Sequence, residues 1–245
     1  RQTDVAGNTS SAQSYSFTLD TTASSPTVGL ASDSGTSSSD KTTNIGTATV
    51  TGLETGATWE YSTNNGSTWT IGTASSFSVT GDGVKTVLVR QTDVAGNTSG
   101  ATSYTFTLDT TAAAPGVVLS SDTGSSGTDR ITKTGTLSIT AEPGSQIEYS
   151  IDGTTWTPTF SAVEGANSVL VRQTDVAGNT SSGSTYSFTL DTQSPVGPKV
   201  ALLSDSGTDG GDKVTNVGTV TVDLVESGAT WEYSTNNGST WTIGT

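Results

Sequence analysis

Aspartate is the residue type in this 245-residue chain whose number and spacing could do chemistry. The chain has 16 Asp residues, and 12 of them fall in four columns that recur three times. The first column is the Asp of a DVAGN segment, and the second is the Asp of an LDT step 16 positions later. The third column opens a D-[ST]-G pattern, and the fourth follows seven positions after it. In order, the columns are Asp4, Asp93 and Asp175; Asp20, Asp109 and Asp191; Asp33, Asp122 and Asp205; and Asp40, Asp129 and Asp212.

The chemistry that such columns predict is cation binding. Clustered carboxylates repel one another unless a cation neutralises them. Ca²⁺ takes six to eight oxygen ligands from carboxylates, carbonyls and amides, whereas Mg²⁺ keeps its waters and zinc prefers His and Cys, which this chain lacks. We therefore expect Ca²⁺ as the cofactor. The candidate ligands are the 12 column residues together with Asn8, Asn97, Asn179 and Asp209.

Two questions about these residues stay open at the level of sequence. Asp is common in turns, where its side chain caps its own backbone, so each column also has a purely structural interpretation. The grouping of the columns is open as well. One grouping joins Asp33, Asp40 and Asp93 inside one repeat, and the other joins Asp20 with acidic loops across the junction between repeats.

Composition excludes several classes of function. The net charge is −14, so nucleic acid is not an expected partner, because its binding needs a Lys/Arg surface. No apolar run is long enough for a membrane-spanning helix, so we expect no direct membrane insertion. Without His and Cys, and with the paired carboxylates confined to repeated loops, we expect no catalytic residues and no enzyme.

The elements that must position these residues are arranged as tandem repeats. The segment RQTDVAGNTS occurs unchanged at residues 1–10, 90–99 and 172–181, which is typical of an array of one small module. Boundaries at the LDT steps divide the chain into the end of one repeat (1–19), two complete repeats (20–108 and 109–190) and the first part of a further repeat (191–245). Because the chain opens inside a repeat, we expect it to be part of a longer array.

Each repeat carries strand patterns and no helical period. Tyr104, Phe106 and Leu108 alternate with Thr, which predicts a half-buried antiparallel strand, and the same pattern stands at residues 15–19 and 186–190. Asn64-Asn65-Gly66 predicts a tight hairpin turn. About seven short strands per repeat and no Cys predict an all-β fold of tandem immunoglobulin-like β-sandwich domains without a disulfide.

The run LDTTA-x-x-P, D-[ST]-G, EYS-x-[ND]-[NG]-x-x-TW and VLVRQTDVAGN resembles the bacterial immunoglobulin-like repeats of giant type I-secreted, biofilm-associated surface adhesins. The resemblance covers essentially the whole chain. It implies an extended stalk outside the cell, at the bacterial surface, whose partners are the neighbouring repeats and whose junctions calcium makes rigid. It carries the calcium role onto Asp20, Asp33, Asp40 and Asp93 with their counterparts.

Two other functions are compatible with the sequence. Trp69, Trp156 and Trp241 occupy matching positions and could form a carbohydrate-binding surface, although a strand Trp more often packs the sandwich. The late strands of residues 1–19 and the early strands of residues 191–245 could complement each other between molecules, which would give head-to-tail self-association into a fibre. Among the charged residues, Arg90 and Arg172 could pair with acidic groups of a neighbouring strand, whereas Glu60, Glu148 and Glu232 are expected to be solvated.

Overall fold

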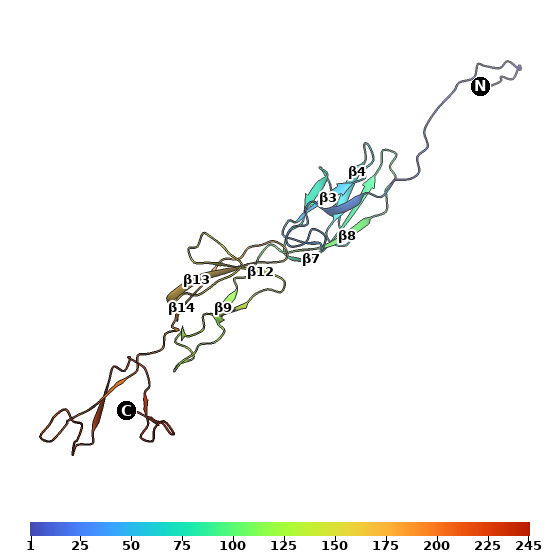
Figure 1. The fold of residues 1–245 in the computed structure, drawn as a ribbon. Helices are drawn as coiled ribbons and strands as arrows, with labels where there is room; N and C mark the ends of the chain where they lie inside the picture. The colour runs from blue at the N-terminus through green and yellow to red at the C-terminus, as the bar shows by residue number, and fades with distance from the viewer.

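The computed structural model describes residues 1–245 as a long, narrow molecule made of strands and loops. Two sandwiches follow one another along its length, with an extended segment at the N-terminus and a smaller group of strands at the C-terminus (Figure 1). Nothing in the structure is a helix long and apolar enough to cross a membrane. The all-β fold expected from the sequence is therefore confirmed.

The repeat at residues 20–108 forms a two-layer sandwich. One sheet has the order β1-β3-β6 and the other β2-β8-β7-β4-β5. All neighbours are antiparallel except β2 and β8, which run parallel. The strands are β1 (Thr27–Leu30), β2 (Thr42–Thr43), β3 (Thr47–Thr51), β4 (Thr58–Ser62), β5 (Thr70–Ile71), β6 (Ser76–Ser78), β7 (Gly83–Thr92) and β8 (Thr102–Leu108).

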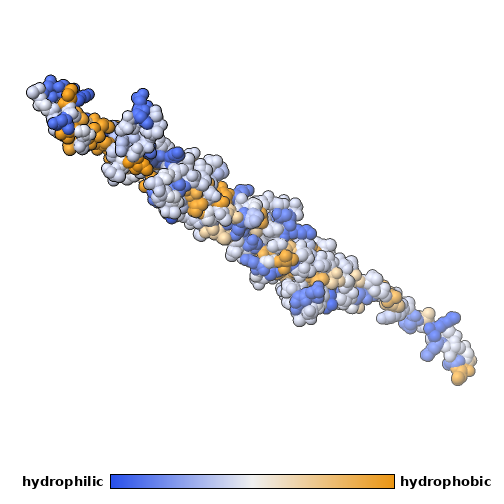
Figure 2. Space-filling model, turned by 90° about the horizontal axis from the view of Figure 1, so that it is seen from below, coloured by the Kyte–Doolittle hydropathy of each residue, from blue (hydrophilic) through white to orange (hydrophobic).

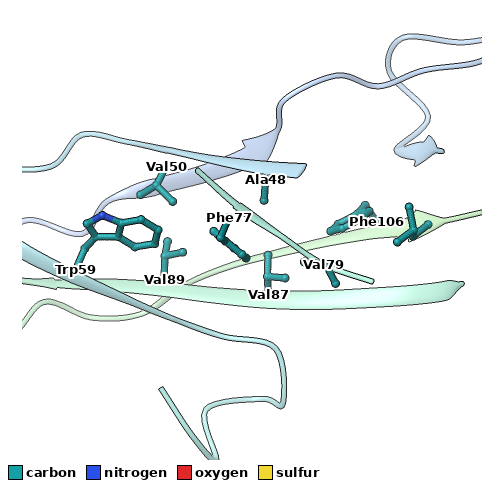
Figure 3. Close-up of a cluster of buried hydrophobic side chains, with 9 residues drawn as sticks. Ala48, Val50, Trp59, Phe77, Val79, Val87, Val89 and Phe106 are labelled. Carbon is teal, nitrogen blue, oxygen red and sulfur yellow. The ribbon is translucent and has the colours of Figure 1, made fainter. Parts of the chain in front are cut away.

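The core of this sandwich lies between the two sheets (Figure 3). Strand alternation turns Val87 and Val89 of β7 inward, where both are fully buried, because successive side chains point to opposite faces. Each fully buried aliphatic or aromatic side chain contributes roughly 1.5–3 kcal/mol. The nine buried apolar residues are Ala48, Val50, Trp59, Phe77, Val79, Val87, Val89, Phe106 and Leu108.

The repeat at residues 109–190 is a thinner version of the same sandwich. Its sheets have the orders β11-β9 and β10-β14-β13-β12, its buried apolar cluster is Leu119, Phe188 and Leu190, and Val169 and Val171 of the larger sheet are fully buried as well. After a single bridge between Tyr149 and Thr157 the chain forms no counterpart of β6, and Pro158 has no amide to donate there. The strands are β9 (Gly116–Leu119), β10 (Ile131–Thr132), β11 (Leu137–Thr140), β12 (Gln146–Ser150), β13 (Gly165–Thr174) and β14 (Ser184–Leu190).

The remaining strands form two separate pairs in residues 191–245. β15 (Lys199–Leu202) pairs with β16 (Val220–Asp223), and β17 (Glu232–Tyr233) pairs with β18 (Thr242–Ile243). Apolar side chains of this part lie on the surface, and Figure 2 shows hydrophobic colour gathered at this end of the molecule.

Two local expectations are wrong. Residues 15–19 have the alternating pattern but form no strand, because no other strand lies beside them to accept their backbone hydrogen bonds. Asn65 and Gly66 do take positive φ (57° and 82°), but the pairing of Tyr61 with Thr70 places their turn inside a longer loop rather than a tight hairpin.

Candidate functional site at the joint between repeats

The first Asp column closes the DVAGN loop, which is residues 93–97 in the first complete repeat. Asp93 Oδ1 accepts the amides of Ala95 (2.9 Å) and Asn97 (2.8 Å), and Asp93 Oδ2 accepts Asn97 Nδ2 (2.8 Å). The Asn97 side-chain amide, followed by the backbone amides of the loop, lowers the pKa of Asp93 below its usual value. Asp4 with Asn8 and Asp175 with Asn179 repeat these contacts. The contacts of the first column are therefore those of Asp side chains that cap their own turns.

The DVAGN loop also holds the LDT step at which its own repeat begins. Asn97 Nδ2 donates to the Asp20 carbonyl (3.1 Å), and Asn179 Nδ2 donates to the Asp109 carbonyl (2.8 Å). The LDT carboxylates face their own backbone, where Asp20, Asp109 and Asp191 each accept the amide two residues later. The first and second columns therefore meet at the N-terminal end of a repeat through Asn and a backbone carbonyl.

A buried glutamine that sequence reasoning missed anchors the same end. Gln91, 1% exposed, donates from Nε2 to the Ser24 carbonyl (2.7 Å) and accepts the Glu54 amide at Oε1 (2.8 Å). Gln173 repeats both bonds, to the Ala113 carbonyl and from the Glu142 amide. The signal was present in the sequence, because this is the Gln of every RQTD segment.

The third column is held from one side only. Asp33 Oδ2 accepts the Lys41 amide (2.9 Å), and Lys41 has a left-handed φ of 62°. Asp122 and Asp205 make the same bond with Arg130 and Lys213. The other oxygen, Oδ1, of Asp33, Asp122 and Asp205 is buried without a hydrogen-bond partner. Burying a carboxylate oxygen without a hydrogen-bond partner costs folding free energy. This oxygen is therefore the position in each repeat where a bound cation would stabilise the chain most.

The fourth column caps its own turn, and in the two complete repeats a short strand, β2 or β10, follows it. Asp40, Asp129 and Asp212 each accept at Oδ1 the amide two residues later, at 2.9, 3.0 and 2.9 Å. The additional candidate Asp209 accepts the Gly211 amide (3.0 Å). These carboxylates are exposed and their side chains serve their own turns.

The structure separates the members of the within-repeat grouping. β7 pairs antiparallel with β8, so Asp93 after β7 lies beside the start of β8. β2 pairs with Thr107 and Leu108 at the end of β8, which places the loop that carries Asp33 and Asp40 at the opposite end of the sandwich. The grouping of Asp33, Asp40 and Asp93 is therefore wrong for geometric reasons.

Across the junction, the D-[ST]-G loop of one repeat (residues 33–36) meets the DVAGN loop of the next (residues 175–179). The Thr36 amide donates to the Val176 carbonyl (3.1 Å), and Ser34 Oγ donates to the Ala177 carbonyl (3.0 Å). Gly35 packs so closely that a Cβ at this position would overlap the Val176 carbonyl oxygen. Thr43 on the same side accepts the Asp109 amide at its carbonyl (3.0 Å), which ties the LDT step to both repeats. The joint is thus made by backbone and hydroxyl contacts.

The four Asp columns differ in how well their carboxylate oxygens could bind Ca²⁺. Nowhere in residues 1–245 do three or more acidic side chains come close enough together to hold a metal ion. The first column already has both oxygens hydrogen-bonded, so it offers the poorest ligands. The third column, with its unpartnered Oδ1, offers the best.

On the outer face of the larger sheet, Arg90 lies between Glu60 and Trp69. Its guanidinium donates to Glu60 Oε2 from Nε (3.0 Å) and Nη2 (2.8 Å), and it stacks 4.0 Å from the Trp69 ring centroid. Arg172 repeats the arrangement with Glu148 (2.9 Å) and Trp156 (3.9 Å). The expected Arg pairing is confirmed. Glu60 and Glu148 are ion-paired rather than only solvated, and these two Trp side chains pack on Arg outside the core.

The fold and the joint define a class of protein built from immunoglobulin-like sandwiches joined end to end. Residues 22–110 match the family model of the bacterial Ig-like domain, which supports bacterial Ig-like repeats in this chain. Among solved structures, the chain is similar to fibronectin(III)-like modules of CbhA from Clostridium thermocellum, with 12% identity, a TM-score of 0.35, and coverage of 68% of this chain and 95% of that one. Nothing among the curated proteins matches.

Proposed function

We propose that this chain is a structural stalk segment of a large bacterial cell-surface adhesin, located outside the cell, that supports adhesion or biofilm formation without being an enzyme. The observation that carries the proposal is the joint of residues 33–36 with residues 175–179, where one repeat bonds directly to the next. Two sandwiches joined end to end make an elongated molecule, which is the shape that a stalk requires. The family match at residues 22–110 supports the extracellular, repetitive character of the chain.

We further propose that calcium reinforces the stalk, at Asp33, Asp122 and Asp205 in place of the full set of Asp columns. The support is the buried Oδ1 of each residue, which has no donor and recurs in all three copies. When bound, Ca²⁺ would neutralise these oxygens. The protein's own part is to hold each carboxylate in place through the amide of Lys41, Arg130 or Lys213.

A direct carbohydrate-binding role is the less favoured alternative. Flat aromatic faces that bind sugars must be open, but the Arg90 and Arg172 guanidinium groups stack on Trp69 and Trp156. Trp241, 60% exposed, has no cation stacked on it, so it is the better probe of this alternative.

Small-angle scattering of the chain combined with a glycan array tests the stalk proposal. We expect an elongated particle whose maximum dimension exceeds that of two sandwiches in line, because the chain continues beyond both of them, and no glycan signal. A compact scattering profile, or glycan binding that Trp241→Ala abolishes, would overturn the proposal. Trp69→Ala serves as the matched control for a Trp covered by Arg.

A further inference from the structure

The three copies of the DVAGN loop in the chain differ in what packs against them. In residues 1–10 the loop stands free of any sandwich and still makes its internal bonds, from Ala6 and Asn8 to Asp4. In residues 93–97 it belongs to a sandwich but is open on its outer side, where Val94 is 78% exposed. In residues 175–179 it is covered by the preceding repeat, and Ala177 is 0% exposed. The same Asp–Asn bonds are therefore present whether or not another repeat covers the loop.

The D-[ST]-G loop is the complementary surface, and each complete repeat carries one at its other end. Ser34 is held for its role by Thr43 and Asn44, since Ser34 Oγ is within 2.8 Å of Thr43 Oγ1 and 2.7 Å of Asn44 Oδ1. Gly35, at φ 99°, brings its backbone against the Val176 carbonyl. The equivalent Gly124, at φ 112°, has nothing within 4 Å of its Cβ position.

We propose that the DVAGN loop is a docking site for the D-[ST]-G loop of another repeat, and that the open copy at residues 93–97 takes such a loop. The inference rests on the proposed stalk function and identifies the contact that keeps consecutive repeats in line. Because one surface lies at each end of a repeat and the two differ, the interface is heterologous and propagates along an array instead of closing a dimer. Glycine on both sides lets the two backbones approach closely, because a Cβ on Gly35 would overlap the Val176 carbonyl oxygen and a Cβ on Gly178 would lie 3.1 Å from Gly35 Cα, a tight contact that requires a small shift.

The two glycines of equivalent position give a matched test. The chain has no Cys, so Thr86→Cys and Ser168→Cys, both at exposed positions, report the distance between the two sandwiches through spin labels. Gly35→Ala and Gly124→Ala place the same side chain on the same left-handed backbone, but only Gly35→Ala forces the joint apart. We expect loss of the single narrow distance peak in Gly35→Ala and its retention in Gly124→Ala, with calcium held constant.

A second pair guards against misfolding of the D-[ST]-G loop. Gly178→Ala should broaden the distance distribution, and Gly96→Ala, whose Cβ meets nothing within 4 Å, should not. Equal distributions within either pair, whether both narrow or both broad, would overturn the docking role. That result would leave the stalk proposal standing if scattering still gave an elongated particle, so the two failures are distinguishable.

The open copy is tested by disulfide trapping between molecules. Thr36 contacts Val176 in the joint, so Ser125, the counterpart of Thr36, should meet Val94 of another copy. Under mild copper-catalysed oxidation, we expect Val94→Cys/Ser125→Cys to form a ladder of linked chains faster than the control Val94→Cys/Thr154→Cys. Equal rates would show that the open loop takes no such partner.

Discussion

At the residue scale, identical residues can be compared within one chain, because they occur both inside and outside a folded repeat. Gln2 and Gln91 share the sequence RQTD, yet Gln2 is exposed and Gln91 is buried and bonded at both ends of its amide. The same holds for Asp4 and Asp93. Differences between such pairs measure what the surrounding sandwich adds.

Gln91→Ala should lower the free energy of unfolding by about 2–3 kcal/mol, since it leaves the Ser24 carbonyl and the Glu54 amide without partners and removes a buried side chain. Gln2→Ala should change it by less than about 0.5 kcal/mol, as is usual for an exposed site. Urea denaturation of the two variants measures the difference. Equal effects would mean that the glutamine bridge is not a stabilising element.

Acid should weaken the N-terminal end of the repeat through Glu54. The Ser24 hydroxyl and amide lower the pKa of Glu54 in the folded chain, so its stabilisation is complete above the unfolded value, about 4.3, and is lost as pH falls through the folded value. Glu54→Gln should therefore lower the melting temperature at pH 7 and converge with the wild type near pH 2. Glu226→Gln, at the equivalent position in residues 191–245, should leave the profile unchanged. A constant gap for Glu54→Gln at every pH would contradict this account.

At the element scale, alternation predicted β8 and β14 correctly but also predicted a strand at residues 15–19, which has the same pattern. An apolar pattern with a period of two specifies which face of a strand would be buried. The strand forms, and that face becomes buried, only where another strand lies beside it. The sequence left open a grouping across the junction between repeats, but the residues that form the joint could not be predicted, for a related reason. Ser34 and Ala177 lie in different repeats, and no local feature of either loop announces the other.

Phe106→Ala should cost about 3–5 kcal/mol of unfolding free energy, because Phe106 is 2% exposed in the core between the sheets. Phe17→Ala should be nearly neutral, since Phe17 holds the same place in the pattern but is 74% exposed. Denaturant melts of both variants provide the measurement. A similar cost for both would show that residues 15–19 pack in solution.

At the scale of the whole molecule, stiffness depends on two contributions that differ in chemistry. The loop contact between repeats uses backbone carbonyls, an amide and a hydroxyl, which a chelator leaves intact. The proposed calcium contribution acts through Asp33 and Asp122, whose unpartnered oxygens lie in the loops that end each sandwich. With a net charge of −14, the chain also gains from any bound cation through reduced self-repulsion.

Removing calcium should therefore soften the array and lower its melting temperature without dismantling the sandwiches. Small-angle scattering and calorimetry in calcium and in EDTA measure both effects, and Asp33→Asn should remove most of the calcium-dependent shift in the first sandwich. Asp223→Asn, outside the four columns, controls for the loss of one negative charge. Identical scattering and melting in the two buffers would overturn the calcium proposal and leave the direct loop contact between repeats as the source of stiffness at the joint.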